Sequence, residues 1–200
     1  MSGTSHEPRR DADRPASGST PAMSSPAMPL ARVTKAQRCQ VLGIVNVTPD
    51  SFSDGGRFHQ ASEAVEHGLR LTRQGADLVD VGGESTRPGA ARVSEAEELR
   101  RVVPVVRELS HAGVQVSVDT MRARVATAAV AAGAVLVNDV SGGLADPAML
   151  PFLAEAGVPC VLMHWRAHSR VMHEHAAYGC VVDEVRNELA QRCAAALAAG

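Results

Sequence analysis

The segment GVQVSVDT, residues 113–120, contains the pattern that decides the fold. A glycine comes first, an apolar run follows at 114–118, and two polar residues, Asp119 and Thr120, end the segment. A glycine just past a helix supplies the left-handed backbone conformation that closes the helix. A short and nearly continuous apolar run is typical of a parallel strand that is buried on both faces. The segment therefore predicts a helix end, a buried strand and a polar strand end in succession.

The same pattern recurs along most of the chain. Apolar runs rich in valine, leucine and isoleucine lie at 41–47, 78–82, 114–118, 135–140 and 158–163. The last four of these runs each follow a glycine: Gly75, Gly113, Gly133 and Gly157. Apolar residues between the runs have the i, i+3, i+4 spacing of amphipathic helices, and Ser94 with Glu97 and Asp146-Pro147 are typical helix starts. Five strand–helix units in a row predict a parallel α/β sheet.

The strand ends favour a closed barrel over an open sheet. A doubly wound nucleotide-binding sheet would carry G-x-G-x-x-G or a P-loop after its first strand, and this chain has neither. Instead every predicted strand ends in polar residues, which are Asn46, the run 82–87, Asp119-Thr120, Asn138-Asp139 and His164. A (β/α)8 TIM barrel builds its site in this way. We predict the first five βα units of such a barrel, with the strands in sequential order.

Composition divides the chain into two parts and limits its partners. Residues 1–32 are rich in Ser, Pro, Thr, Ala and Arg without a hydrophobic period, which predicts a disordered leader before a partial barrel domain at 33–200. A net charge of −2 and 2% aromatic residues argue against nucleic acid and anionic membranes as partners. No apolar run approaches the ~18 residues that span a bilayer. Four cysteines without a C-x-x-C pair indicate a reducing compartment, and hence a cytoplasmic protein.

Three of the polar strand ends suggest specific chemistry. Asn46 either starts a turn or offers a neutral oxygen ligand to a hard cation. Asp119 and Asn138 follow neighbouring strands, and together they provide the acceptors and donors that suit a planar heterocycle with mixed N–H and C=O edges. The alternative for both is that they cap the helices that follow.

Two further groups of polar residues lie in loops. Thr86 and Arg87 stand in a loop stiffened by Pro88, where an arginine can bind an oxyanion in bidentate fashion. The histidines after the fifth run are His164, His168, His173 and His175. They could ligate zinc, but the end of the first strand lacks the H-x-H of a metal-hydrolase barrel, which favours a solvated loop.

The motifs taken together resemble those of the dihydropteroate synthases of the folate pathway. They are GIVNVTPDSFSDGG (43–56), DVGGESTRPGA (80–90), SVDT (117–120), NDVSGG (138–143) and LMHWR (162–166), and they occur in the family's order. The resemblance implies a transferase that condenses 6-hydroxymethyl-7,8-dihydropterin pyrophosphate with p-aminobenzoate and releases pyrophosphate with help from Mg²⁺. It also implies a homodimer for the full-length protein, and a p-aminobenzoate pocket in which sulfonamides compete.

The resemblance also implies roles for individual residues. Asn46 resembles the family's metal-proximal asparagine. Thr86 and Arg87 resemble the pair near the pyrophosphate and p-aminobenzoate. Asp119 and Asn138 resemble two contacts to the pterin edge.

Three further residues match apolar positions of the family. Met163 resembles the side chain that lines the pterin slot, and Phe52 and Pro88 resemble walls of the p-aminobenzoate pocket. The polar loop after the first strand would then close over an electron-poor dihydropterin methylene and exclude water, with Phe52 as a wall and Gly55-Gly56 as a hinge.

Three later motifs of the family are absent from this sequence. They are D-P-G-x-G-F with a pterin-contacting Asp, S-R-K with a pterin-contacting Lys, and R-x-H, which binds phosphate. The only lysine, Lys35, precedes the first strand. We therefore expect a truncated reading frame or fragment, and no measurable turnover from these 200 residues alone. The alternative is a non-catalytic pterin-binding remnant or scaffold. A corrinoid-methyltransferase type of barrel is disfavoured because it lacks the TPDSFSDGG loop.

Overall fold

The computed structural model describes Met1, residues 38–48 and residues 57–200. The predicted leader and its boundary at residue 32 lie outside these ranges. No helix in the described ranges is long and apolar enough to cross a membrane.

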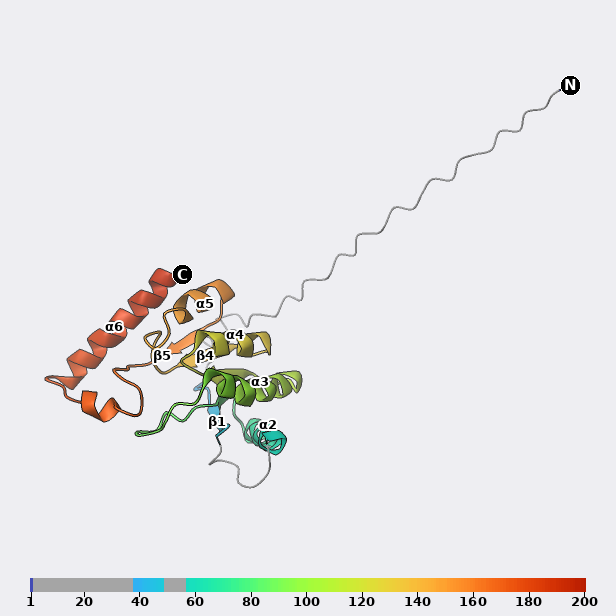
Figure 1. Ribbon diagram of the computed structural model, residues 1–200, viewed down its shortest axis with the longest axis horizontal. Coiled ribbons are helices and arrows are strands. Elements are labelled where there is room, and N and C mark those ends of the chain that lie inside the picture. The colour runs from blue at the N-terminus through green and yellow to red at the C-terminus, as the bar shows by residue number, and fades with distance from the viewer. Residues whose placement is uncertain (2–37, 49–56) are drawn as a thin grey trace.

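Five parallel strands form one sheet in the order β1-β2-β3-β4-β5 (Figure 1). The strands are β1 (Leu42–Asn46), β2 (Leu78–Gly82), β3 (Val116–Asp119), β4 (Leu136–Asp139) and β5 (Cys160–Leu162). Each pairs in parallel with the next strand in the sequence. The sequential order confirms the predicted α/β barrel arrangement, because a doubly wound sheet would place the first strand inside the sheet.

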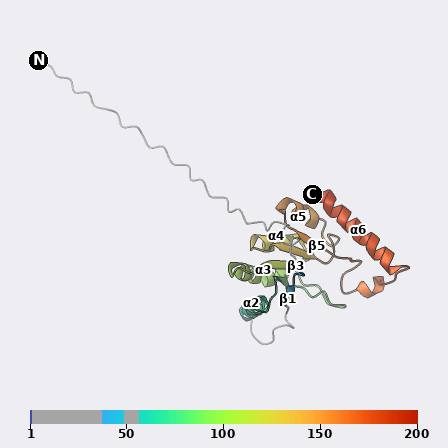
Figure 2. The ribbon, with the colours of Figure 1, turned by 180° about the vertical axis from the view of Figure 1, so that it is seen from behind.

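The helices lie in a row along one face of this sheet. They are α2 (Arg57–Arg73), α3 (Glu95–His111), α4 (Ala123–Ala131) and α5 (Met149–Ala156), and each contacts the next. A 3₁₀ turn, η2 (Met172–His175), and the long helix α6 (Val181–Ala199) follow β5. Figures 1 and 2 show α6 at the periphery beside α5.

The core fills the space between the sheet and the helices. Fully buried valines on alternate strand positions face the helices, and they are Val45, Val79, Val81, Val116, Val118 and Val137. From α3, Val102, Val105, Val106 and Leu109 pack into the same cluster. The opposite face carries Ile44 at 53% exposed and Val161 at 39% exposed on the edge strands, which pair with one neighbour each among the described residues. That face is the one a barrel turns inward.

Most predicted helix boundaries are confirmed. Gly75, Gly113, Gly133 and Gly157 all have positive φ, between 61° and 112°. Ser94 caps α3, since its Oγ accepts a hydrogen bond from the Glu97 N–H at 3.2 Å. The helix start predicted at Asp146-Pro147 comes two residues early, because α5 begins at Met149. Asp146 still bonds at this start, since its Oδ1 accepts from the N–H of Ala148 at 3.0 Å, while its Oδ2 accepts from the N–H of Ala123, the first residue of α4, at 2.8 Å.

Close packing at Gly83 gives a stability prediction. A Cβ on Gly83 would lie 2.7 Å from Cγ2 of Val102 and 3.2 Å from Cγ of Glu98, and both of these residues are buried. We expect Gly83→Ala to destabilise the protein by about 1–3 kcal/mol through overpacking. Gly179→Ala is the matched control, because its Cβ would meet only Glu184 Oε1 at 3.4 Å. Equal denaturant midpoints for the two variants would contradict this account.

Candidate functional site

One row of paired residues crosses the carboxyl ends of four strands. Asn46 pairs with Gly82, Gly82 with Asp119, and Asp119 with Asn138. A Cβ on Gly82 would lie 3.4 Å from Oδ2 of Asp119 and 3.7 Å from Oδ1 of Asn46. The missing side chain of Gly82 therefore leaves space that a carboxylate and an amide oxygen both border. Three of the predicted site residues, Asn46, Asp119 and Asn138, are thus in one row.

The surroundings of Asp119 disfavour the ionised form of its carboxyl group. Burial, reinforced by the negative charges of Asp80, Glu98, Asp139 and Glu84 in that order, raises the pKa of the Asp119 carboxyl to about 7. These groups come from β2, α3, β4 and the loop after β2. A buried carboxylate that is surrounded by negative charges binds N–H donors more favourably than a carboxylate in water does. The donors replace the hydration that the carboxylate lost on burial. Shifts of this size are enriched at functional sites.

A second acid, Asp80, lies two residues before Gly82 on the same face of β2. It was not predicted as a site residue. Its Oδ2 accepts a hydrogen bond from Nδ2 of Asn138 at 2.9 Å, and the residue is 3% exposed. The signal was present in the sequence, since Asp80 is the one charged residue within the apolar run 78–82. Asp139 follows Asn138 at the end of β4, and its side chain is on the other face of the sheet. Its carboxylate accepts hydrogen bonds from Ser141 and from the N–H of Gly143, which stabilises the loop after β4.

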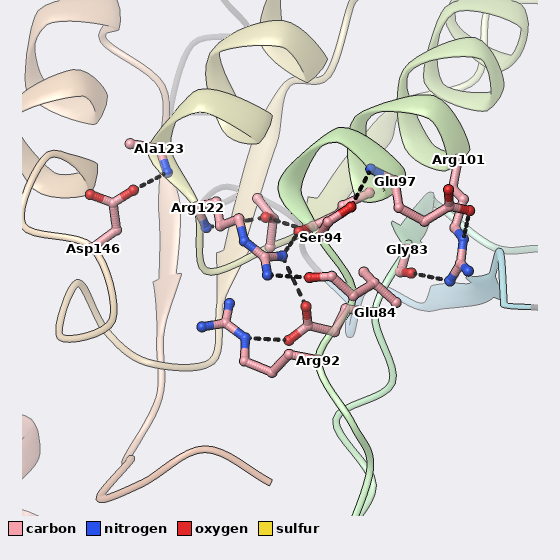
Figure 3. Close-up of polar contacts among 12 residues, drawn as sticks. Gly83, Glu84, Arg92, Ser94, Glu97, Arg101, Arg122, Ala123 and Asp146 are labelled. Carbon is pink, nitrogen blue, oxygen red and sulfur yellow. Dashed lines mark hydrogen bonds and ion pairs between the residues drawn. The ribbon is translucent and has the colours of Figure 1, made fainter. Parts of the chain in front are cut away.

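An ion-pair cluster joins the segment after β3 to α3 and to the loop after β2 (Figure 3). Arg122 donates to Glu84 at 2.9 Å and to Glu98, which is 1% exposed. Arg92 donates to the other carboxylate oxygen of Glu84 at 2.9 Å, and Thr120 donates to Glu98 at 2.5 Å. Arg122 also donates to the backbone carbonyl of Val93 at 2.7 Å. The cluster therefore fixes both ends of the loop that carries Thr86, Arg87 and Pro88.

The remaining predicted site residues lie outside the row of paired strand ends. Thr86 borders a small pocket together with Asp119 and members of the ion-pair cluster. Arg87 and Pro88 are exposed neighbours of Thr86 in the same loop and do not line that pocket. Met163, 44% exposed, follows β5 and is not part of its lining. Phe52 lies outside the described residues.

The loop after β5 contacts the loop after β2. The N–H of Gly89 donates to the carbonyl of Ser169 at 2.8 Å, and Arg92 lies 3.3 Å from Nε2 of His168. His164 is 2.7 Å from Glu188 of α6. Within the described ranges, no three His, Cys, Asp or Glu side chains come together as a metal site. His164 and His168 thus contact separate partners, Glu188 and Arg92.

The row offers limited but suitable oxygen donors for a hard cation. Asn46 Oδ1 and Asp119 Oδ2 border the same space above Gly82. Mg²⁺ commonly binds through one or two protein oxygens and completes its coordination with water and phosphate oxygens of a substrate. The two residues fit that mode of binding and do not form a complete cage.

The raised pKa of Asp119 predicts a pH-dependent stability difference. The unfolded carboxyl releases its proton near pH 4, whereas the folded one keeps it up to about pH 7, so the folded state loses stability as the pH rises between these values. Asp119→Asn is neutral at every pH. We expect its melting temperature to exceed that of the wild type by more at pH 8 than at pH 5.5. A constant difference across this range would show that Asp119 is ionised throughout.

Three comparisons with known proteins agree on one family. Residues 42–200 match the model of the family described as "Pterin binding enzyme". A dihydropteroate synthase of Mycobacterium leprae is 57% identical over 162 residues, which is 80% of this chain and 57% of that protein. The dihydropteroate synthase of Xanthomonas albilineans with 4-aminobenzoic acid superposes with a TM-score of 0.74 at 50% identity, over 82% of this chain and 58% of that chain.

A second structure of the Xanthomonas albilineans enzyme, in complex with 7,8-dihydropteroate, superposes with a TM-score of 0.70 at 47% identity. The superposition covers 82% of this chain and 57% of the Xanthomonas chain. The chain thus spans somewhat more than half the length of these relatives.

Proposed function

The chain belongs to the pterin-binding enzyme family, and from that premise we propose that the protein is a dihydropteroate synthase. It would condense 6-hydroxymethyl-7,8-dihydropterin pyrophosphate with p-aminobenzoate to give 7,8-dihydropteroate and pyrophosphate, as a cytoplasmic transferase of folate biosynthesis. The observation that carries the proposal is the row of Asn46, Asp119 and Asn138 across the ends of β1, β3 and β4. Relatives of 50% and 47% identity hold 4-aminobenzoic acid and 7,8-dihydropteroate.

Asp119 and Asn138 are the proposed contacts to the pterin ring. The ring edge carries an amino group, a ring N–H and a carbonyl, so it needs both acceptors and donors. The Asp119 carboxylate accepts from the N–H groups, and the Asn138 amide complements the mixed edge. Ligand N–H groups would stabilise the ionised form of Asp119 and lower its pKa from about 7 when the pterin binds. Met163 is the proposed apolar wall of the pterin slot.

The loop residues are assigned to the other end of the substrate. Thr86 and Arg87 would contact the pyrophosphate and p-aminobenzoate, with Pro88 and Phe52 as walls of the aromatic pocket. Because the ion-pair cluster holds the loop at Glu84, Arg92 and Val93, the exposed segment between them has anchored ends. Asn46 would hold Mg²⁺ together with phosphate oxygens of the substrate. Mg²⁺ supplies positive charge that stabilises the departing pyrophosphate.

The chemistry exchanges one bond for another at the pterin methylene. The C–O bond to pyrophosphate breaks, a C–N bond to the aromatic amine forms, and the amine loses a proton. The departing group takes the bonding electrons with it, so the methylene becomes electron-poor and sensitive to water. Residues that fix the ring and exclude water therefore determine whether the amine or water is the nucleophile.

An assay of the protein made from its own gene tests the proposal. Dihydropterin pyrophosphate and radiolabelled p-aminobenzoate should yield labelled dihydropteroate and one equivalent of pyrophosphate. A sulfonamide should compete with p-aminobenzoate and leave the affinity for the pterin unchanged. Pterin binding without incorporation of label would instead identify a non-catalytic pterin-binding protein. Absence of both binding and turnover would refute the assignment.

A further inference from the structure

Asp80 makes a hydrogen bond that passes over a neighbouring strand. It sits in the middle of β2, and its Oδ2 accepts from Nδ2 of Asn138 on β4 at 2.9 Å. β3 lies between these two strands. The β3 residue paired with Asp80 is Ser117, which is fully buried. Its short side chain lies on the same face of the sheet as Asp80, so we expect a branched side chain at this position to crowd the bond.

We propose that Asp80 is a positioning residue, which sets the orientation of the Asn138 amide and thereby determines which atoms of Asn138 face a bound pterin. An ionised carboxylate can only accept hydrogen bonds, whereas an amide has one accepting oxygen and one donating NH₂ group. Asp80 therefore selects the rotamer in which Nδ2 of Asn138 points toward it. The carbonyl Oδ1 of Asn138 is left for the ligand. This inference rests on the proposed function.

The surroundings of Asp80 support a role toward a ligand. Its second oxygen, Oδ1, is buried and has no hydrogen-bond partner among the described residues. Buried polar atoms are normally paired, and an unpaired carboxylate oxygen is costly in the absence of a donor. The floor of the site thus has acceptor capacity in addition to the bond that orients Asn138.

A double-mutant cycle on pterin affinity tests the inference. We expect Asp80→Ala to weaken binding of 6-hydroxymethylpterin about tenfold, which corresponds to one hydrogen bond of ~1.4 kcal/mol. Asp80→Asn keeps an acceptor for Nδ2 but no longer excludes the opposite rotamer, so it should lose less than about threefold. In an Asn138→Ala background, Asp80→Ala should cause no further loss. Losses that multiply in the double variant would overturn the proposal, as would equal losses for Asp80→Ala and Asp80→Asn.

Variants of Ser117 address the same bond without changing either partner. Ser117→Ala keeps the path between β2 and β4 open and should bind the pterin as the wild type does. Ser117→Val should block the path and reproduce the loss of Asp80→Ala. Each variant is checked by its melting curve, and the KM for p-aminobenzoate should stay unchanged, which a general loss of structure would not allow. A wild type that binds no pterin refutes the proposed function together with this inference, whereas a wild type and an Asp80→Ala variant of equal affinity refute this inference alone.

Discussion

Arg122→Ala is expected to destabilise the protein by about 3–5 kcal/mol, because it leaves a buried carboxylate without its counter-charge. Glu98 is 1% exposed and Glu84 is 9% exposed, and Arg122 donates to both. Among the residues that the structure describes, Thr120 alone would remain as a donor to the Glu98 carboxylate. Loss of this amount approaches the whole stability of a typical domain, so the variant should be partly unfolded at 37 °C. Urea denaturation at pH 7 measures the effect.

Arg124→Ala provides a matched control, because Arg124 lies in the first turn of α4 and Arg122 directly precedes that helix. Arg124 pairs with Glu95 at 2.9 Å, but their side chains are 76% and 38% exposed. An exposed pair of this kind contributes about 0–1 kcal/mol, so the control should remain close to wild type. Adding Glu98→Gln to Arg122→Ala should recover part of the loss, because the buried group is then neutral. Equal stabilities of the Arg122 and Arg124 variants would contradict this account of the buried ion pair.

Asp119→Ala is expected to weaken pterin binding about tenfold to hundredfold. The change removes one charge-assisted hydrogen bond, which contributes about 1.5–3 kcal/mol. The same change relieves the crowding of negative charge around Asp119, so the protein itself should not become less stable at pH 8. Lower affinity in a protein that is at least as stable distinguishes a ligand contact from a structural residue. Calorimetric titration with a pterin at pH 8 measures it.

Asp183→Ala is the control for a general effect of removing one negative charge. Asp183 lies in the first turn of α6 with a side chain 57% exposed, and it pairs with Arg186. Its removal should leave pterin affinity unchanged. If Asp119→Ala also binds the pterin as tightly as the wild type, then Asp119 serves the fold only and the proposed edge contact is wrong.

The architecture could be predicted from the sequence because its signals are local. Each glycine that ends a helix, each apolar run and each amphipathic stretch depends on residues close in the chain, and parallel neighbours follow from the short joints between units. The start of α5 lies two residues beyond the predicted one, although Oδ1 of Asp146 does accept the local bond from Ala148. The bond from Ala123 of α4 to the other oxygen could not be predicted, because that partner is distant in the sequence.

The site could be predicted only in part, for the same reason. Asn46, Asp119 and Asn138 stand at strand ends, so a parallel sheet must bring them to one edge. Glu98 and Arg122 depend on packing between α3 and the end of β3, and an acid on the apolar side of a helix gives no indication of its partner. Predicted assignments for Arg87, Pro88 and Met163 remain predictions, as does that for Phe52.

A crystal structure of the protein with a bound pterin is the most direct test of the central claim, that the row of strand ends binds the ring edge. The account predicts ring N–H groups within about 3.2 Å of the Asp119 carboxylate and of the Oδ1 of Asn138. Nδ2 of Asn138 should still donate to Asp80. A pterin bound elsewhere would contradict the account, for example in the groove lined by Trp165, Arg166 and Gln191 beside α6.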